Sequence, residues 1–253
     1  VYKRQRLPWP GLEDVRIIDE RSLFNTKDLS GLDYHEGWIY GVNNKKGTYF
    51  VFKVNEVNDI EFYQGFDANG KEVSFTNGRG DLDSEGISLA DDGKMYLAVE
   101  RDNDNKNTNY NLIVEVENPL NQGSKVNASR QWDITKQLPD VGANLGIETI
   151  EWVSFEDVDG KLWDDSKNAP FNSNDYPNSA SEGIFFVGLE ENGNIYAFIL
   201  NKDGTSSLVN TLDRGISDVM GLNYDKDQKL LWAETDNGYN NMLSVIKLNG
   251  EKD

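Results

Sequence analysis

The chain has 253 residues, no cysteine and one histidine, and its 44 acidic residues outnumber 25 basic ones to give a formal net charge of −19. This charge disfavours nucleic acid and anionic membrane surfaces as partners, because both repel an acidic protein. Without cysteine, disulfides and thiolate metal sites are excluded. No apolar run approaches the ~18 residues of a membrane span. The composition therefore favours cations as partners and predicts no nucleic-acid partner and no membrane span.

The N-terminal pentapeptide, residues 1–5, matches the translated tail of a common sequencing adapter. We therefore expect these residues to be an assembly scar, with the native N-terminus and any export signal lying upstream. No change of composition divides the rest of the chain. We expect residues 6–253 to form a single domain.

Short segments rich in aromatic and β-branched residues, bounded by Gly, Asn or Asp, recur along the chain and predict β-strands. They fall into four units in which Leu32, Ile87, Ile150 and Leu222 occupy equivalent positions. No stretch shows the sustained 3.6-residue period of an amphipathic helix. The pattern predicts an all-β propeller with four four-stranded blades. The fourth unit lacks its outer strand, and residues 14–19 have the character to supply it and close the ring.

The clearest unit is an acidic hairpin over residues 81–102, with a tight turn at Asp92-Gly93. Antiparallel strands joined by a tight turn bring their outer ends together. Carboxylates at the start of the first strand should therefore lie beside those at the end of the second. The other units carry acidic residues at the same two places, so one face of the propeller is predicted to be lined with carboxylates.

Crowded carboxylates repel one another, by ~1 kcal/mol for a pair about 4 Å apart in water and ~4 kcal/mol at a surface-like dielectric constant. They must spread apart, take up protons or bind cations. Hard oxygen ligands without His or Cys favour Ca²⁺ over Zn²⁺ or copper. We expect one or more Ca²⁺ ions on this face, with ligands drawn from Asp83, Glu85, Glu100, Asp102, Glu148, Asp218, Glu234 and Asp236. The alternative is a solvated acidic rim whose residues only form turns.

Few other residues suggest a site. His35 is the only histidine, and no Gly-x-Ser-x-Gly motif accompanies it, so we interpret it as a turn residue. Trp9 and Trp163, which we place in loops, are candidates for stacking on a sugar.

The acidic hairpin resembles the phytase-like, or esterase-like, β-propeller family. The resemblance rests on Asp-Ser-Glu-Gly-Ile at residues 83–87, Asp92-Gly93 and Glu100-Arg101, with later copies at residues 146–150 and 217–222. It implies export from the cytoplasm, hence an extracellular or periplasmic location, and a propeller usually described as six-bladed. The four long units of this chain depart from that number.

The same resemblance implies a metal-dependent hydrolase that acts on a phosphoester or ester. Metal ions would polarise the substrate and lower the pKa of a bound water. Glu85, Glu100 and Glu148 would be ligands or the general base, and Arg101 would be the catalytic cation facing an anionic substrate. The alternative is a non-catalytic, Ca²⁺-stabilised extracellular module that binds a sugar or a protein. In either case we expect a monomer.

Overall fold

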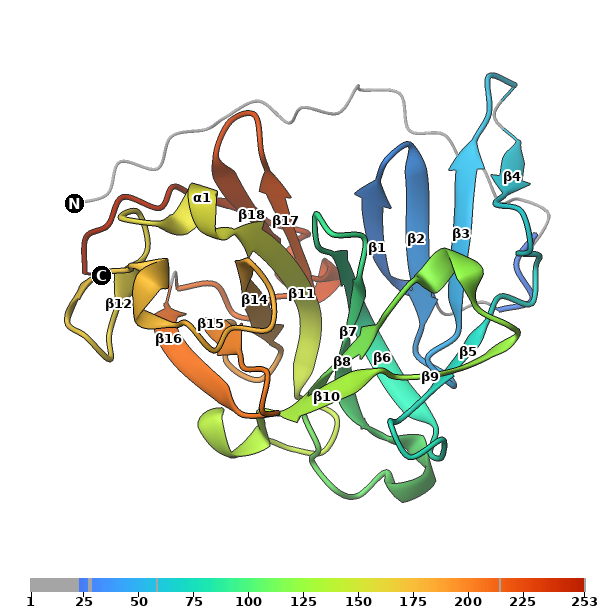
Figure 1. Cartoon of the computed structure of the whole chain (residues 1–253), viewed down its shortest axis with the longest axis horizontal. Coiled ribbons are helices and arrows are strands. Elements are labelled where there is room, and N and C mark those ends of the chain that lie inside the picture. Colours follow the sequence, from blue (N-terminus) through green and yellow to red (C-terminus); the bar gives the residue numbers. More distant parts are fainter. Residues whose placement is uncertain (1–22, 27–28, 58, 214, 253) are drawn as a thin grey trace.

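The structure is a computed structural model that describes residues 23–26, 29–57, 59–213 and 215–252 (Figure 1). Four antiparallel sheets dominate it and confirm the predicted four-bladed propeller. Blade 1 contains β1 (Leu29–His35), β2 (Trp38–Asn43), β3 (Tyr49–Val54) and β4 (Ile60–Phe62). Blade 2 contains β6 (Leu82–Leu89), β7 (Met95–Asp102), β8 (Leu112–Val116) and β10 (Arg130–Asp133).

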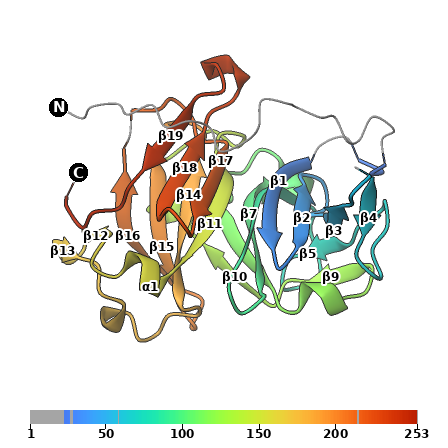
Figure 2. The same ribbon diagram turned by 90° about the horizontal axis from the view of Figure 1, so that it is seen from above.

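Blade 3 is formed by β11 (Ile147–Ser154), β14 (Gly183–Leu189), β15 (Ile195–Leu200) and β16 (Ser206–Leu212). Among the described residues blade 4 has three strands, β17 (Gly221–Asp225), β18 (Leu230–Glu234) and β19 (Leu243–Ile246). Residues 14–19, predicted to supply its fourth strand, lie outside the described part of the chain. In Figure 1 blade 1 lies at the right, blade 2 at the lower centre, blade 3 at the left and blade 4 above blade 3; Figure 2 shows the blades from above.

Two small sheets join the loops. A parallel pair, which the sequence did not suggest, links β5 (Glu72–Ser74) to β9 (Lys125–Asn127). The insertion in blade 3 holds a hairpin of β12 (Trp163–Asp164) and β13 (Ala169–Pro170). The helices of the described segments are single turns, as the lack of helical periodicity predicts: α1 (Phe155–Val158), η1 (Asn103–Asn105), η2 (Pro119–Asn121), η3 (Thr135–Gln137), η4 (Ser173–Asp175) and η5 (Asn237–Tyr239). Among the described residues no helix has the length and apolar character to cross a membrane.

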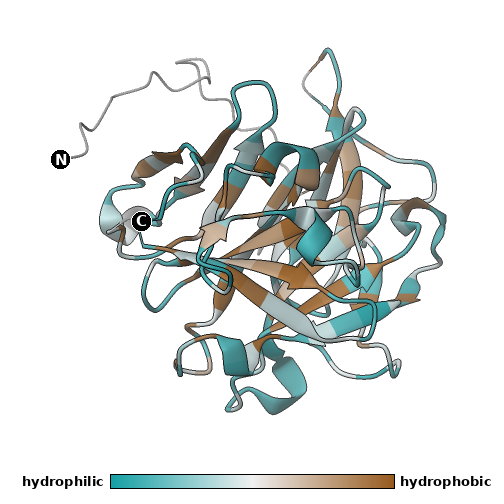
Figure 3. Cartoon of the chain, turned by 60° about the vertical axis from the view of Figure 1, so that its left-hand side comes forward, coloured by the Kyte–Doolittle hydropathy of each residue, from teal (hydrophilic) through white to brown (hydrophobic). Residues whose placement is uncertain are grey.

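The core lies mainly between neighbouring blades, where apolar side chains of adjacent sheets meet. Strands carry most of the apolar residues and loops most of the polar ones (Figure 3). Tyr40 of blade 1 shares one cluster with Ile87 and Leu89 of blade 2. Further clusters of the same kind join blade 2 to blade 3 and blade 3 to blade 4. Burial at these interfaces provides the main driving force that holds the blades side by side.

Hydrogen bonds between the inner strands set the register of one blade against the next. The carboxylate of Asp33 accepts from the backbone N–H of Leu89 at 2.6 Å. The Ser88 hydroxyl accepts from the N–H of Trp152 at 2.9 Å, and the Glu151 carboxylate accepts from that of Tyr224 at 2.8 Å. The three acceptors occupy equivalent places in the sequence pattern. Each comes one residue after a position that the four units share: Leu32, Ile87 or Ile150.

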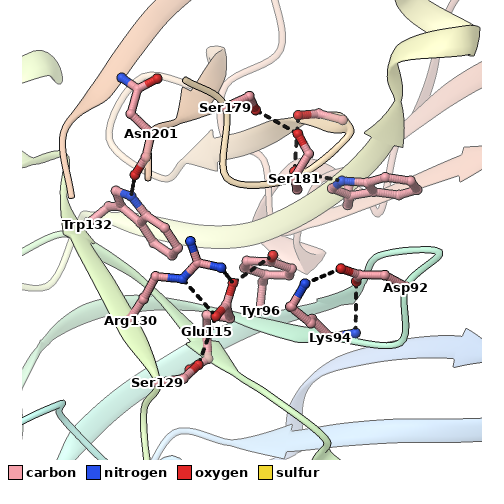
Figure 4. A network of polar contacts seen from close by, with 12 residues as sticks. Asp92, Lys94, Tyr96, Glu115, Ser129, Arg130, Trp132, Ser179, Ser181 and Asn201 are labelled. Atoms are coloured by element: carbon pink, nitrogen blue, oxygen red, sulfur yellow. Dashed lines mark hydrogen bonds and ion pairs between the residues drawn. The ribbon is translucent and has the colours of Figure 1, made fainter. Parts of the chain in front are cut away.

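A buried carboxylate also organises the outer part of blade 2 (Figure 4). Glu115 is 1% exposed and accepts hydrogen bonds from the Tyr96 hydroxyl, the Ser129 hydroxyl and both Nε and Nη2 of Arg130, at 2.9–3.0 Å. Burial raises the pKa of Tyr96, and the negative charge of Glu115 adds to the shift. Because every polar group in the network finds a partner, the charge is held inside the fold.

Candidate functional site

Irregular strand pairing directs three glutamates toward one face of the propeller. In the β6–β7 ladder Asp83 pairs with Arg101, Ser84 with Val99 and Gly86 with Ala98, so that Glu100 and Glu85 are each skipped. In the β11–β14 ladder Ile147 pairs with Leu189 and Thr149 with Gly188, so that Glu148 is skipped in the same way. Bulged residues of this kind leave the regular ladder, bend the strand and re-aim side chains, often beside functional sites.

Five carboxyl groups from blades 2 and 3 meet where these bulges lie. We call them the carboxylate cluster: Asp83, Glu85, Glu100, Glu148 and Glu190. One oxygen from each of Asp83, Glu85 and Glu100 lies within 4.8 Å of the other two. The same holds for Glu100, Glu148 and Glu190. Glu100 belongs to both triads, so the two groups of oxygens form one continuous site that spans two blades.

The cluster has fewer positive partners than negative charges. Arg101 Nε lies 2.6 Å from Asp83 Oδ2, and Arg101 Nη1 donates to the carbonyl of Ala143 at 2.9 Å. Glu100 Oε2 lies 3.9 Å from Arg101 Nη1. Glu100 Oε1 accepts from the backbone N–H of Gly146 at 2.8 Å. In the part of the chain that the structure describes, the ion pairs to the five carboxyl groups come from Arg101 alone, and Arg101 is committed to Asp83 and a backbone carbonyl.

Burial and mutual repulsion shift the pKa values of the cluster upward. Burial raises the pKa of Glu85 to about 7, with Asp83 adding to the shift and the Ser30 hydroxyl and Arg101 opposing it. Burial likewise raises the pKa of Glu100 to about 7, although the Gly146 N–H and Arg101 lower it. For Glu148, burial and the charges of Glu85, Glu100 and Glu190 together raise the pKa to about 10. Near neutral pH the cluster therefore holds protons, whereas ordinary carboxyl groups are ionised at that pH.

The remaining predicted ligands lie outside the two triads. Asp102 accepts from the backbone N–H groups of Asp81 and Asp104, both at 3.0 Å, and caps η1. Asp218 is 5% exposed, and burial together with the charge of Asp236 raises its pKa. Glu234 is exposed at the end of β18. The structure therefore groups Asp83, Glu85, Glu100 and Glu148 and leaves the other four predicted ligands apart.

Sequence reasoning left one member of the cluster out of the ligand set. Glu190 follows β14 directly and stands at a strand exit, which is the position that identified Glu100 on β7. Burial raises its pKa, and Asp218 and Asp236 add to the shift.

Trp163 was wrongly placed in a loop: it forms β12 opposite Pro170, and its indole Nε1 is buried. Trp9 lies outside the described residues.

A cavity of about 450 Å³ opens beside the cluster. Its wall includes residues of the inner strands of all four blades and of the second strand of blade 4, among them Leu32, Glu85, Ile87, Thr149, Leu222 and Trp232. Glu85 therefore belongs both to the carboxylate cluster and to the cavity wall. A small molecule in the cavity would lie next to anything bound by the first triad.

No protein-family model matches the chain, and no curated protein matches it. Among solved structures it is similar to the "extracellular domain of the putative one component system BT4673 from B. thetaiotaomicron", at 9% identity and a TM-score of 0.36 over 89% of this chain. It spans only 29% of that protein. A second similar structure is a "putative 6-phosphogluconolactonase from Bacteroides uniformis", at 14% identity and a TM-score of 0.34, covering 87% of this chain and 71% of the other. Likenesses this distant transfer no activity to the chain.

Proposed function

We propose that the carboxylate cluster binds a divalent cation, and that the cation is Ca²⁺. The observation that carries this proposal is the sharing of Glu100 between two oxygen triads, each within 4.8 Å. Buried and half-buried carboxylates at this spacing repel one another until a proton or a metal ion joins them. A cation placed between the triads would relieve the repulsion that, in addition to burial, raises the pKa of Glu148 to about 10.

The donor set fits Ca²⁺ better than other common ions. All donors are carboxylate oxygens, which suit hard cations, and the chain has no cysteine to attract Zn²⁺ or copper. Glu85, Glu100, Glu148 and Glu190 would be the ligands. Asp83 would contribute the oxygen that Arg101 leaves free. Mg²⁺ demands near-ideal octahedral geometry, whereas Ca²⁺ tolerates the irregular arrangement that bulged strands provide.

Titration calorimetry on the metal-stripped full chain tests this proposal. Ca²⁺ should bind with measurable heat and raise the Tm, and Mg²⁺ should bind more weakly. Glu100→Gln removes the shared ligand and should abolish both effects, although a glutamine oxygen can still accept from Gly146. Glu117→Gln, at an exposed position, is the matched control and should behave as the unaltered chain. An unaltered chain with neither heat nor a change of Tm would refute the proposal.

A hydrolase is the further activity that the site supports. The supporting observation is that Glu85 joins the first triad to the cavity wall, which would place a bound metal beside a small substrate. Such a metal polarises a phosphoester or ester and lowers the pKa of bound water. In this proposal Glu85 and Glu100 hold the metal or act as general base. Arg101 faces an anionic substrate only if its contact with Asp83 opens.

The alternative is a non-catalytic module that binds a sugar or protein and uses Ca²⁺ for stability. It is supported by the engagement of Arg101, which is 15% exposed as a side chain and tied to Asp83. In both versions we propose an extracellular or periplasmic location, and the Kd for Ca²⁺ should then lie in the range of extracellular modules, roughly 10⁻⁴–10⁻³ M.

Screening against phosphomonoesters and acyl esters, with and without Ca²⁺, separates the two versions. A hydrolase should show Ca²⁺-dependent turnover that Glu85→Gln removes while the fold is retained, as judged by circular dichroism. Ca²⁺ binding without turnover on any substrate would favour the module.

A further inference from the structure

The cavity beside the carboxylate cluster reaches blade 4, where the inner strand is less closely approached than in blades 1 and 2. An added Cβ on Gly31 would stand 3.0 Å from the Gly86 Cα, and one on Gly86 would stand 2.7 Å from the Thr149 Cα. At Gly221, the equivalent position of blade 4, the nearest described heavy atom beyond its chain neighbours is Cβ of Glu234, in the same blade, at 3.4 Å. Gly31, Gly86, Thr149 and Gly221 all line the cavity.

Much of the cavity wall is apolar, and part of that apolar surface is in contact with water. Ile87 and Leu222 lie in the wall and are 3% and 9% exposed. Leu32 and Leu243 line the same cavity but are 62% and 41% exposed. Apolar side chains around a concavity are typical of small-molecule sites. A ligand with an apolar body would remove the surface of both leucines from water, which is favourable.

The charged side chains of the wall are carboxylates. Among the described residues that line the cavity, they are Glu85, Asp225 and Glu234. Asp225 is engaged within its own turn, because Oδ1 accepts from the backbone N–H groups of Asp227 and Gln228 at 3.0 and 2.8 Å. Its Oδ2 accepts from Gln228 Nε2 at 2.7 Å. Glu85 belongs to the carboxylate cluster.

Glu234 is the carboxylate that remains for a ligand. It ends β18 and is exposed. Its Oε2 lies 3.6 Å from the place that an added Cβ on Gly221 would take, so the carboxylate lies over the cavity wall. Within the described part of the chain, neither a hydrogen bond nor an ion pair engages this carboxylate.

The surrounding charge also favours a cationic ligand. The carboxylate cluster adjoins the cavity through Glu85, and the whole chain has a formal net charge of −19. A concave surface lined by one sign of charge raises the local concentration of ions of the opposite sign. The same charges oppose a phosphate or carboxylate group in the metal-free cavity.

We propose that the cavity binds a small organic cation, whose ammonium group pairs with Glu234 and whose apolar body lies against Leu32, Leu222 and Leu243. The ammonium supplies hydrogen-bond donors to a carboxylate that accepts none within the fold, and the apolar body covers the exposed leucines. The volume of about 450 Å³ lies within the range of small-molecule sites. This proposal does not depend on Ca²⁺ binding, because Glu234 lies outside the two oxygen triads.

Titration of the full chain with three ligands of equal chain length tests the proposal. The ligands are hexylammonium, 1-hexanol and hexanoate, and ligand-observed NMR measures their Kd values. At pH 8 an alkylamine is protonated, as a lysine side chain is, and EDTA makes the result independent of metal binding. Hexylammonium should bind about fivefold more tightly than 1-hexanol, as expected for a solvent-exposed ion pair. Hexanoate should bind more weakly than either.

Three variants separate the contribution of charge from that of apolar contact. Glu234→Gln should weaken hexylammonium binding by about fivefold and leave 1-hexanol binding unchanged. Leu32→Ser should weaken the binding of both ligands by a similar factor, because both use the apolar wall. Glu117→Gln changes the net charge equally at an exposed position outside the cavity and should bind all three ligands as the unaltered chain does.

Several results would overturn the proposal. One is an unaltered chain that does not bind hexylammonium, and another is 1-hexanol or hexanoate binding as tightly as the amine. Equal losses in Glu234→Gln and Glu117→Gln would show that the amine responds only to net charge. Amine binding that Leu32→Ser leaves unchanged would place the ligand outside this cavity.

Discussion

Gly86 of β6 lies so close to Thr149 of β11 that an added Cβ would stand 2.7 Å from the Thr149 Cα. The approach of two backbones at this point brings the carboxyl groups of blades 2 and 3 together, because Glu85 and Glu148 precede these residues directly. The contact between Gly86 and Thr149 therefore sets both the separation of blades 2 and 3 and the geometry of the carboxylate cluster.

Gly86→Ala should lower the free energy of unfolding by about 2 kcal/mol, since overpacking of this kind costs roughly 1–3 kcal/mol. Chemical denaturation measures it. Gly123→Ala is the matched control, because no heavy atom lies within 4 Å of an added Cβ there. Equal losses in the two variants would show that the close approach has no energetic consequence. The Ca²⁺ affinity of Gly86→Ala should also fall, because moving the blades apart separates the ligands.

Glu85→Gln should stabilise the metal-free chain at pH 8 but not at pH 5. Burial raises the pKa of Glu85 from 4.5 to about 7, so the folded state binds a proton more tightly than the unfolded state does. The resulting stability is complete below pH 4.5 and is lost as the pH rises through 7. For one group this amounts to at most about 3 kcal/mol. Glutamine does not ionise and avoids the loss.

Thermal melts of the unaltered chain and of Glu85→Gln in EDTA, from pH 5 to pH 8, measure this difference in stability. The two Tm values should diverge as the pH rises, with the variant higher. Parallel curves would mean that Glu85 does not titrate in the folded state as its burial suggests. Glu117→Gln should follow the unaltered chain throughout, because its carboxylate is exposed.

Ca²⁺ binding should release protons near neutral pH. Burial and the neighbouring carboxylates raise the pKa of Glu148 to about 10, so its carboxyl group is protonated at pH 8, and a metal ligand must give up that proton. Calorimetry in two buffers of different ionisation enthalpy gives the number of protons released, which should be close to one at pH 8. Affinity should increase between pH 6 and pH 9. Binding without proton release would exclude Glu148 as a ligand.

The blades were predictable because each is a local pattern. Aromatic and β-branched runs between Gly and Asn turns mark strands, and pairing within a hairpin follows from a short turn, which is why Glu85 and Glu100 were expected to meet. The bulges were not predictable, since the skipped Glu100, Glu85 and Glu148 depend on the exact register of two ladders, β6–β7 and β11–β14. Without that register Asp102 looks equivalent to Glu100, yet it caps η1 instead. Glu190 enters the site through blade-to-blade contact, which no single hairpin encodes.

Glu115→Ala should be among the most destabilising substitutions in blade 2. It removes the acceptor of Tyr96, Ser129 and Arg130 at once and leaves a guanidinium, 34% exposed as a side chain, without its ion-pair partner. Losing one partner of a buried pair costs about 3–5 kcal/mol, and the partial exposure of Arg130 places the expected loss near the lower figure.

Denaturation of Glu115→Ala beside Glu117→Ala, which lies two residues later and is exposed, isolates the effect of burial. The double variant with Arg130→Met should recover part of the loss, because the unpaired charge is then removed as well. If Glu115→Ala alone stayed within about 0.5 kcal/mol of the unaltered chain, the network would be dispensable. The core of blade 2 would then be held by its apolar contacts alone.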